Sequence, residues 1–290
     1  MEEAIDIRTL QCYQKATEEQ REMCIRDSHK TMPDKTLSGC MTGGVNMMEL
    51  MKLTERVYYL PYDPEKGRPL LGYIVGQDYS MAIDAGYSRS HVNDFYNAIQ
   101  KCGFRKPDFT VLTHWHYAHT LGLRAISGVS VAHEKTNAYL KEEQKKAKNE
   151  NYIDILKKED AYFAKEYENS NKLEIELPDM EFTKDFQLDL GDAEVYIFRS
   201  VSTHTDDAVC IYISTEKVLF LGDATSEDYY NDGYMDREEL SAVIHMIEKI
   251  DCKYCILSHC EPWEKEELLP YLYHKLENPI FTSNNTAIKK

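Results

Sequence analysis

The sequence has 290 residues, of which 42% are hydrophobic and 29% charged, and this composition is ordinary for a globular protein of one full domain or two small ones. Its formal net charge of −16 disfavours nucleic acid polymers and anionic membranes as partners, because most of the surface would repel phosphate. No apolar run reaches about 18 residues and the N-terminus lacks a basic, apolar signal sequence, so we expect neither a membrane span nor secretion. The eight scattered cysteines are typical of reduced thiols in a cytoplasmic protein.

Residues 1–46 show no sustained hydrophobic period, and Met23–Ser28 (MCIRDS) resembles a translated sequencing adapter. We expect this segment to be disordered or an artefact of the gene model, and we expect the folded domain to comprise residues 47–290. A loss of stability or activity on deleting residues 1–46 would contradict the artefact hypothesis.

The first half of the predicted domain consists of strands followed by a helix. A helix with apolar residues at spacings of three and four is predicted after Ser90, as its N-cap, and ends at Gly103. The strands predicted in this half are Val57–Leu60, Leu71–Val75, Ser80–Ile83 and Phe109–Leu112.

A highly charged segment, about residues 134–176, separates the two halves. Nearly half of its residues carry a charge of interleaved sign, which favours a pair of solvated helices over a functional lid. The second half then repeats the order of strands and helix, with a capping box of Asp236 and Glu239 and a last helix from about Lys265. Its predicted strands are Phe186–Leu190, Ala193–Phe198, Val209–Ile213, Val218–Leu221 and Tyr254–Leu257. This order predicts an α/β protein in which two mixed sheets pack together between flanking helices.

Three histidines follow the strand that ends at Leu112, in the segment T-H-W-H-Y-A-H-T. In extended chain His114 and His116 point the same way, and His119 comes within reach once the chain turns into a helix. Imidazole is the commonest neutral ligand of zinc. Surface histidines at a strand end are the alternative, but the cluster favours a metal site.

Three more potential ligands lie in loops at the ends of predicted strands. His204 precedes Val209–Ile213, Asp223 follows Val218–Leu221 in the segment L-F-L-G-D-A, and His259 follows Tyr254–Leu257. Loops at strand ends can converge on one site. The six residues together therefore predict a metal centre.

This HxHxxH pattern, with the loop histidine, the Gly-Asp and the last histidine, resembles the metallo-β-lactamase superfamily over about residues 52–275. The resemblance implies an αββα sandwich, with Asp84 as an aspartate that braces the site without binding metal. It implies that His114, His116 and His204 bind a first zinc ion, that His119 and His259 bind a second, and that Asp223 bridges the two. It is strongest to bacterial hydrolases and implies attack by metal-bound hydroxide on an ester, lactone, thioester or amide.

Ala118 is the one clear departure, because the family motif HxHxDH has at this position an aspartate that binds the second metal and orients the attacking water. We therefore expect a filled first site, a weakened second site and impaired activity. Natural divergence and a deliberate Asp→Ala change made to trap substrate both explain the alanine. We favour the latter because drift should remove ligands at more than one position.

Other functions on this fold remain open. They are a phosphodiesterase for a small nucleotide, a non-catalytic metal-binding or substrate-trapping protein, and a di-iron oxidoreductase, which is disfavoured because such proteins carry a flavin domain. The expected partner is a small-molecule substrate, and a homodimer is allowed. Trp115 and Tyr117 flank the histidines as candidates for the lining of the substrate pocket, but Trp115, between two ligands in extended chain, is expected to point away from the metal into packing. Asp206 and Asp207 are candidates to orient His204 or to cap the following turn, and Tyr229, Tyr230 and Tyr234 are candidates for a wall of the site.

Overall fold

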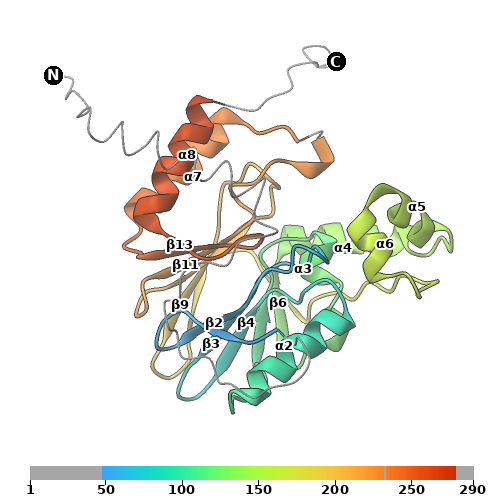
Figure 1. The fold of residues 1–290 in the computed structure, drawn as a ribbon, viewed down its shortest axis with the longest axis horizontal. Helices are drawn as coiled ribbons and strands as arrows, with labels where there is room; N and C mark the ends of the chain where they lie inside the picture. The colour runs from blue at the N-terminus through green and yellow to red at the C-terminus, as the bar shows by residue number, and fades with distance from the viewer. Residues whose placement is uncertain (1–47, 232, 279–290) are drawn as a thin grey trace.

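The computed structural model describes residues 48–231 and 233–278, so the predictions for residues 1–46 lie outside the described part. Two sheets form the centre of the fold (Figure 1). The first has the strand order β1-β2-β3-β4-β5-β6-β7 and the second the order β13-β12-β11-β10-β9-β8. The strands of the first sheet are β1 Met51–Lys52, β2 Val57–Leu60, β3 Leu71–Val75, β4 Ser80–Ile83, β5 Phe109–Val111, β6 Val129–His133 and β7 Met180–Phe182. Those of the second are β8 Phe186–Asp189, β9 Glu194–Arg199, β10 Val209–Ile213, β11 Val218–Gly222, β12 Tyr254–Leu257 and β13 Trp263–Glu264.

Helices cover the outer face of each sheet, which confirms the predicted αββα sandwich of two mixed sheets (Figure 1). The helices are α2 Arg89–Lys101, α3 Tyr117–Thr120, α4 Glu134–Lys146, α5 Tyr152–Glu159, α6 Ala161–Glu166, α7 Arg237–Lys249 and α8 Lys265–Glu277, with 3-10 turns η1 Leu123–Ala125 and η2 Tyr229–Asn231. The α2 helix packs on the first sheet, and α7 and α8 pack on the second. Among the described residues, no helix is both long and apolar enough to cross a membrane.

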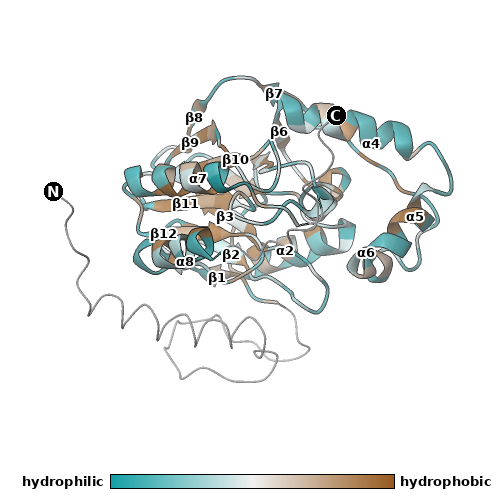
Figure 2. Ribbon diagram, turned by 90° about the horizontal axis from the view of Figure 1, so that it is seen from above, coloured by the Kyte–Doolittle hydropathy of each residue, from teal (hydrophilic) through white to brown (hydrophobic). Residues whose placement is uncertain are grey.

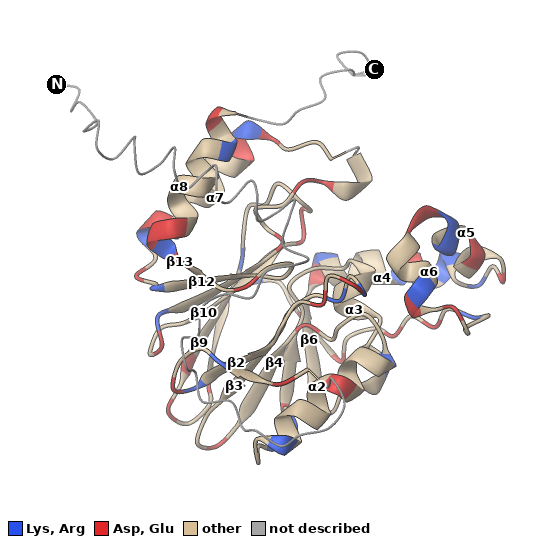
Figure 3. Ribbon diagram, in the orientation of Figure 1, with Lys and Arg blue, Asp and Glu red and all other residues tan. Residues whose placement is uncertain are grey.

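Apolar side chains from both sheets form the central core, so the strands are the most hydrophobic part of the ribbon (Figure 2). Charged residues lie mainly on the helices and loops around it (Figure 3). The sheets approach closely where Gly72 of β3 faces Phe220 of β11, because a Cβ atom added at Gly72 would lie 2.5 Å from the Phe220 ring. Burial of this apolar surface is the main stabilising contribution to such a sandwich.

The N-cap of α2 differs from the prediction. Ser88, rather than Ser90, lies in extended backbone and its hydroxyl accepts a hydrogen bond from the His91 amide. Both serines stand before the same apolar pattern, so the pattern alone does not choose between them. Gly103 ends the helix with a φ of +77°, as expected.

The charged segment forms three helices, α4 to α6, instead of the predicted pair. They lie beside the sandwich at the end of the first sheet (Figure 1). Two glutamates hold them there: the buried Glu143 accepts hydrogen bonds from Tyr117 and Tyr152, and Glu166, whose side chain is 5% exposed, pairs with Arg68 at 2.7 Å. The segment is therefore packed against the domain and is not merely solvated.

Candidate metal centre

The candidate ligands come from the ends of strands in both sheets. Asp84 follows β4 and His114 follows β5, and these two strands are parallel. Asp223 follows β11 and His259 follows β12, which are also parallel. Parallel strands carry their C-terminal ends to the same edge of a sheet, so all these loops meet at one edge of the sandwich.

Backbone hydrogen bonds join the two sheets at this edge. The Val209 amide, at the start of β10, donates to the Thr113 carbonyl at 2.8 Å, and the Leu70 amide donates to the Ser258 carbonyl at 2.7 Å. Gly222 turns the chain with a φ of +57°, and a Cβ atom there would lie 2.9 Å from Thr113. The glycine thus allows the loop that carries Asp223 to approach the histidine segment.

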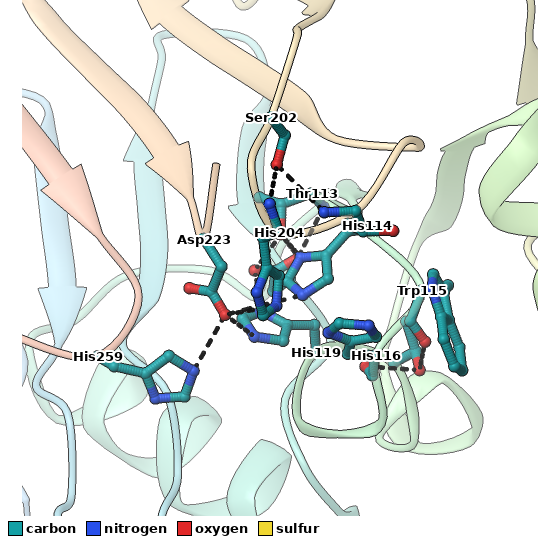
Figure 4. Close-up of polar contacts among 12 residues, drawn as sticks. Thr113, His114, Trp115, His116, His119, Ser202, His204, Asp223 and His259 are labelled. Carbon is teal, nitrogen blue, oxygen red and sulfur yellow. Dashed lines mark hydrogen bonds and ion pairs between the residues drawn. The ribbon is translucent and has the colours of Figure 1, made fainter. Parts of the chain in front are cut away.

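One oxygen of Asp223 is the centre of the cluster (Figure 4). Its Oδ2 atom lies near the Nε2 atoms of four histidines, at 3.7 Å from His114, 3.3 Å from His119, 3.6 Å from His204 and 3.2 Å from His259. This arrangement is what a carboxylate shared between two metal positions requires. The structure thus brings these five predicted residues together.

The sixth predicted residue, His116, lies beside His114 and His204, with ring centroids 4.7 Å and 4.6 Å apart. Ligand atoms of His114, His116 and His204 lie within 4.8 Å of one another, and so do those of His114, His119 and Asp223. His259 is the most accessible of the cluster, with 40% of its side chain exposed. It therefore lies on the open side of the site.

The buried nitrogens of the cluster fit a metal ion. The Nε2 atoms of His114, His119 and His204 are buried and have no hydrogen-bond partner among the described residues. Such orphaned polar atoms are costly unless something else satisfies them. A cation at their point of convergence would do so, and imidazole nitrogens with a carboxylate are a donor set that zinc accepts.

The opposite ring nitrogens are each held by the protein. His119 Nδ1 lies 2.7 Å from Asp84 Oδ2, His114 Nδ1 lies 3.0 Å from Thr113 Oγ1, and His204 Nδ1 contacts the Glu227 carbonyl. A proton on Nδ1 leaves the Nε2 lone pair free to face the cluster. Asp84 therefore has the bracing position that the resemblance implied.

The charge states of these groups follow from burial and from their neighbours. Burial, together with His119 and His116, holds the pKa of His114 well below its usual value, which keeps the ring neutral as a metal ligand must be. Burial would lower the pKa of His119 too, but Asp84 and Asp223 raise it to about 10. A metal ion at His119 Nε2 needs the neutral ring, so metal and proton would compete for this nitrogen.

Ala118 lies on α3, where it is half-buried and packs with Tyr117 against the apolar cluster under the α4–α6 segment. It brings no ligand atom to the site. Asp84 does not replace the missing carboxylate, because its two oxygens already accept hydrogen bonds from the Thr113 amide, the Thr113 hydroxyl and His119. The carboxylate that the family motif has at position 118 is therefore not replaced by Asp84.

The other neighbours take roles that the sequence left open. Asp206 pairs with Lys135 and Tyr139, and Asp207 accepts hydrogen bonds from Thr136 and Thr205, so neither carboxylate bonds to the His204 ring. The Nδ1 partner of His204 is instead the Glu227 carbonyl, which sequence reasoning missed because a backbone acceptor has no residue signature.

The aromatic residues near the histidines differ in how closely they approach the candidate ligands. Trp115 lies on the far side of His116 from Asp223, as expected for a residue between two ligands in extended chain (Figure 4). Tyr230 contacts His116, with ring centroids 5.0 Å apart, and Tyr229 packs on Tyr230. Tyr234 bridges to Asp228 and its hydroxyl faces Asp236. Of the three tyrosines proposed as a wall, Tyr230 has the direct contact with a candidate ligand.

Solved structures with the same architecture are distant in sequence. A metallo-beta-lactamase from Pontibacter korlensis is 18% identical with a TM-score of 0.59, over 80% of this chain and 99% of that one. The stereoselective inverting sec-alkylsulfatase Pisa1 from Pseudomonas sp. is 14% identical with a TM-score of 0.59, over 79% of this chain and 41% of that one. An archaeal metallo-beta-lactamase superfamily protein from Sulfolobus tokodaii is 18% identical with a TM-score of 0.55, over 81% of this chain and 91% of that one. At these identities the likeness establishes the fold alone.

No curated protein matches the sequence significantly. The family model described as the metallo-beta-lactamase superfamily matches residues 70–259, a span that contains the whole candidate centre from Asp84 to His259. The chain therefore belongs to the metallo-β-lactamase superfamily.

Proposed function

We propose that this protein is a zinc-dependent hydrolase of a small-molecule ester, lactone, thioester or amide, with one strong metal site and one weakened site. The observation that carries the proposal is the convergence on the Asp223 carboxylate of three buried Nε2 atoms, none of which has a hydrogen-bond partner among the described residues. His114, His116 and His204 would hold the first ion, His119 and His259 would hold the second, and Asp223 would be shared between the two. When bound, zinc would activate water and polarise the oxygen of the scissile bond.

The residues of the chain have two tasks in this chemistry. The contacts of Asp84, Thr113 and the Glu227 carbonyl fix the tautomers of His119, His114 and His204, so that the site is arranged before substrate arrives. Asp223 is the carboxylate left in the cluster to accept a proton from the attacking water. It is a weak base, because His259 and His119 hold its pKa well below the usual value against the opposing effect of burial.

Activity should therefore be low, and restoring the missing carboxylate should increase it. We expect Ala118→Asp to raise the hydrolysis of at least one neutral ester, thioester or lactone by about a hundredfold or more, the size of a typical general-base contribution. His114→Ala should abolish activity in both backgrounds. His245→Ala, an exposed histidine on α7 that bonds to the Ser241 carbonyl, is the matched control and should change nothing.

The assay also separates the alternatives. Hydrolysis of a small nucleotide phosphodiester, and not of any ester, thioester, lactone or amide, would replace the proposed substrate class with the phosphodiesterase. Zinc binding without hydrolysis by either the native chain or Ala118→Asp would favour the non-catalytic metal-binding function, which the half-buried methyl group at Ala118 also supports.

A further inference from the structure

The α4–α6 segment supplies an aromatic ring to the edge of the candidate metal centre. Tyr139 of α4 stacks on Trp115 at 5.4 Å, and Tyr230 of η2 stacks on Trp115 at 5.2 Å, with interplanar angles of 29° and 24°. Tyr230 is also the ring that contacts His116. Trp115, Tyr139 and Tyr230, which we call the aromatic wall, thus join three distant parts of the chain beside one candidate ligand.

Much of this wall is open to solvent although it is well packed. Tyr230 is 56% exposed and the adjoining Tyr229 is 60% exposed, and Tyr139 is 37% exposed. Exposed aromatic rings next to a reactive centre provide apolar surface on which a substrate group can pack. The wall is therefore accessible to a substrate group placed over His116.

The wall is held in place from beneath. The buried Glu143 of α4 accepts hydrogen bonds from the Tyr117 hydroxyl and, at 2.5 Å, from the Tyr152 hydroxyl. Tyr117 is the residue between His116 and Ala118, so this contact ties α4 directly to the histidine segment. The rings consequently keep a fixed relation to the candidate ligands, as a preformed binding surface requires.

The polar groups around the wall are acidic. The Tyr139 hydroxyl donates to Asp206 at 2.7 Å, and the Tyr230 amide donates to Asp228 at 3.0 Å. Of the cations nearby, Lys135 pairs with Asp206, Lys275 pairs with Glu227, and the Arg199 guanidinium donates to the Asp206 backbone carbonyl. A negative group placed directly against Tyr139 or Tyr230 would meet the Asp206 or Asp228 carboxylate.

We propose that the aromatic wall binds the part of the substrate remote from the scissile bond, and that this part is an uncharged apolar group, an alkyl chain or an aromatic ring, instead of an anionic one. This inference rests on the proposed function, because it assigns the substrate class of the same centre. It selects neutral acyl compounds from the proposed substrates and excludes those with a carboxylate or phosphate at that end.

Binding, measured without turnover, tests the inference separately from the hydrolysis assay. The probes are the ketone octan-2-one, which cannot be hydrolysed, and its ω-carboxylate analogue. They are titrated into the zinc-loaded protein and followed by the fluorescence of Trp115 in a Trp263→Phe background, since the chain has two tryptophans. The wild-type background is titrated in parallel to verify that Trp263→Phe leaves binding intact. We expect the neutral probe to bind more tightly by about fivefold, the effect of one like charge at about 4 Å in water.

Three variants make the test specific to the wall. Tyr230→Ala should weaken the neutral probe by about fivefold or more, whereas Tyr79→Ala, an equally large exposed tyrosine in the turn between β3 and β4, should leave it unchanged. Tyr230→Arg should shift the preference toward the carboxylate probe by about tenfold. Equal binding of the two probes, or no effect of either Tyr230 variant, would overturn the inference even if esters are hydrolysed. The expected binding order without any hydrolysis would instead refute the proposed function alone.

Discussion

The orientation of the candidate ligand His119 depends on a single residue, Asp84. It has a left-handed backbone, with a φ of 65°, directly after β4, and this conformation points its carboxylate under the histidine segment. Its oxygens accept hydrogen bonds from the Thr113 amide and hydroxyl and from His119 Nδ1. Since the carboxylate can only accept, His119 must carry its proton on Nδ1 and present Nε2 to Asp223.

Asp84→Asn should therefore change the tautomer of His119 with little change of shape. Asparagine tolerates the left-handed backbone and keeps one acceptor for the Thr113 amide, but its NH₂ group would donate to His119 Nδ1 and move the ring proton to Nε2. We expect zinc held by His119 to bind about 10- to 100-fold more weakly. The measurement is a competition titration in the Ala118→Asp background, with the tautomer read from ¹⁵N chemical shifts of the histidine rings.

Thr113→Ser is the control for this variant, because serine retains the hydroxyl that His114 and Asp84 contact. Unchanged zinc affinity in Asp84→Asn, with folding intact, would mean that Asp84 braces the loop without setting the tautomer.

The candidate ligands could be predicted from the sequence because each lies close to the end of a predicted apolar strand and carries a distinctive side chain. Residues that support them were harder to predict. Glu143 and Tyr139 lie in a segment whose charge is typical of a solvated helix, and only the fold brings them to Tyr117 and Trp115. Contacts between such distant segments have no local periodicity that a sequence pattern could reveal.

At the scale of elements, the start of α4 is tied to the loop that carries His204. Thr136 donates a hydrogen bond to Asp207 at 2.8 Å, and Thr205 donates to its other oxygen at 2.7 Å. Asp207 is buried without a cationic partner in these contacts, and burial raises its pKa to about 6 despite both hydrogen bonds. Ionising this residue therefore has a cost in the folded state.

This cost gives the stability a definite pH dependence. Between the unfolded pKa of about 3.9 and the folded pKa of about 6, the folded state binds more protons, so the free energy of unfolding falls as the pH rises, by up to about 3 kcal/mol from this group. The asparagine in Asp207→Asn cannot ionise, so the free energy of unfolding of this variant should lack this pH dependence. The stability of the wild type relative to Asp207→Asn, from urea unfolding, should thus decrease between pH 4 and pH 7.

The neighbouring Asp206 provides the opposite case. Burial acts to raise its pKa, but hydrogen bonds from Lys135 and Tyr139 hold it below the usual value. Its stabilising contribution is present above about pH 4 and is lost on acidification, so Asp206→Asn should be more damaging at neutral than at acid pH.

The prediction for Asp207 has its own contradicting outcome. A pH-independent difference in stability between wild type and Asp207→Asn would show that Asp207 does not titrate in this range.

The regular strands and α7 were predicted from alternation, helical spacing and caps, but the short strands were not. β1 and β13 contain two residues each and β7 contains three, too few for a period to appear. β6 was missed although Ser127 and Gly128, the latter with a φ of 76°, mark a turn directly before it, because the short segment Val129–His133 lies between the histidine segment and the charged segment. These strands exist through pairing with longer neighbours, which is a property of the whole sheet.

At the scale of the whole molecule, the separation of the two sheets determines whether their loops meet. Because Gly72 has no side chain, the Phe220 ring can fill the space between β3 and β11. Phe220 lies two residues before Gly222, where the chain turns toward Asp223. Close packing leaves no room for added atoms in such a core. The distance between the sheets and the geometry of the centre are therefore coupled.

Gly72→Ala tests the close contact between the two sheets. The added methyl group would lie 2.5 Å from Phe220 and 3.1 Å from Ile83, so we expect a loss of about 1–3 kcal/mol in the free energy of unfolding. Combining it with Phe220→Leu should cost less than the sum of the two single changes, as measured by a double-mutant cycle. Strict additivity would mean that the two side chains do not compete for the same space.

The central claim is that this fold has one strong metal site and one weakened by Ala118. The most direct measurement is the zinc content per chain after equilibration at micromolar free zinc, by elemental analysis of the unmodified Ala118 chain, Ala118→Asp and His114→Ala. We predict about one tightly bound ion in the Ala118 chain and about two in Ala118→Asp, with marked loss in His114→Ala. Two tightly bound ions in the Ala118 chain, or none in any of the three, would contradict the account.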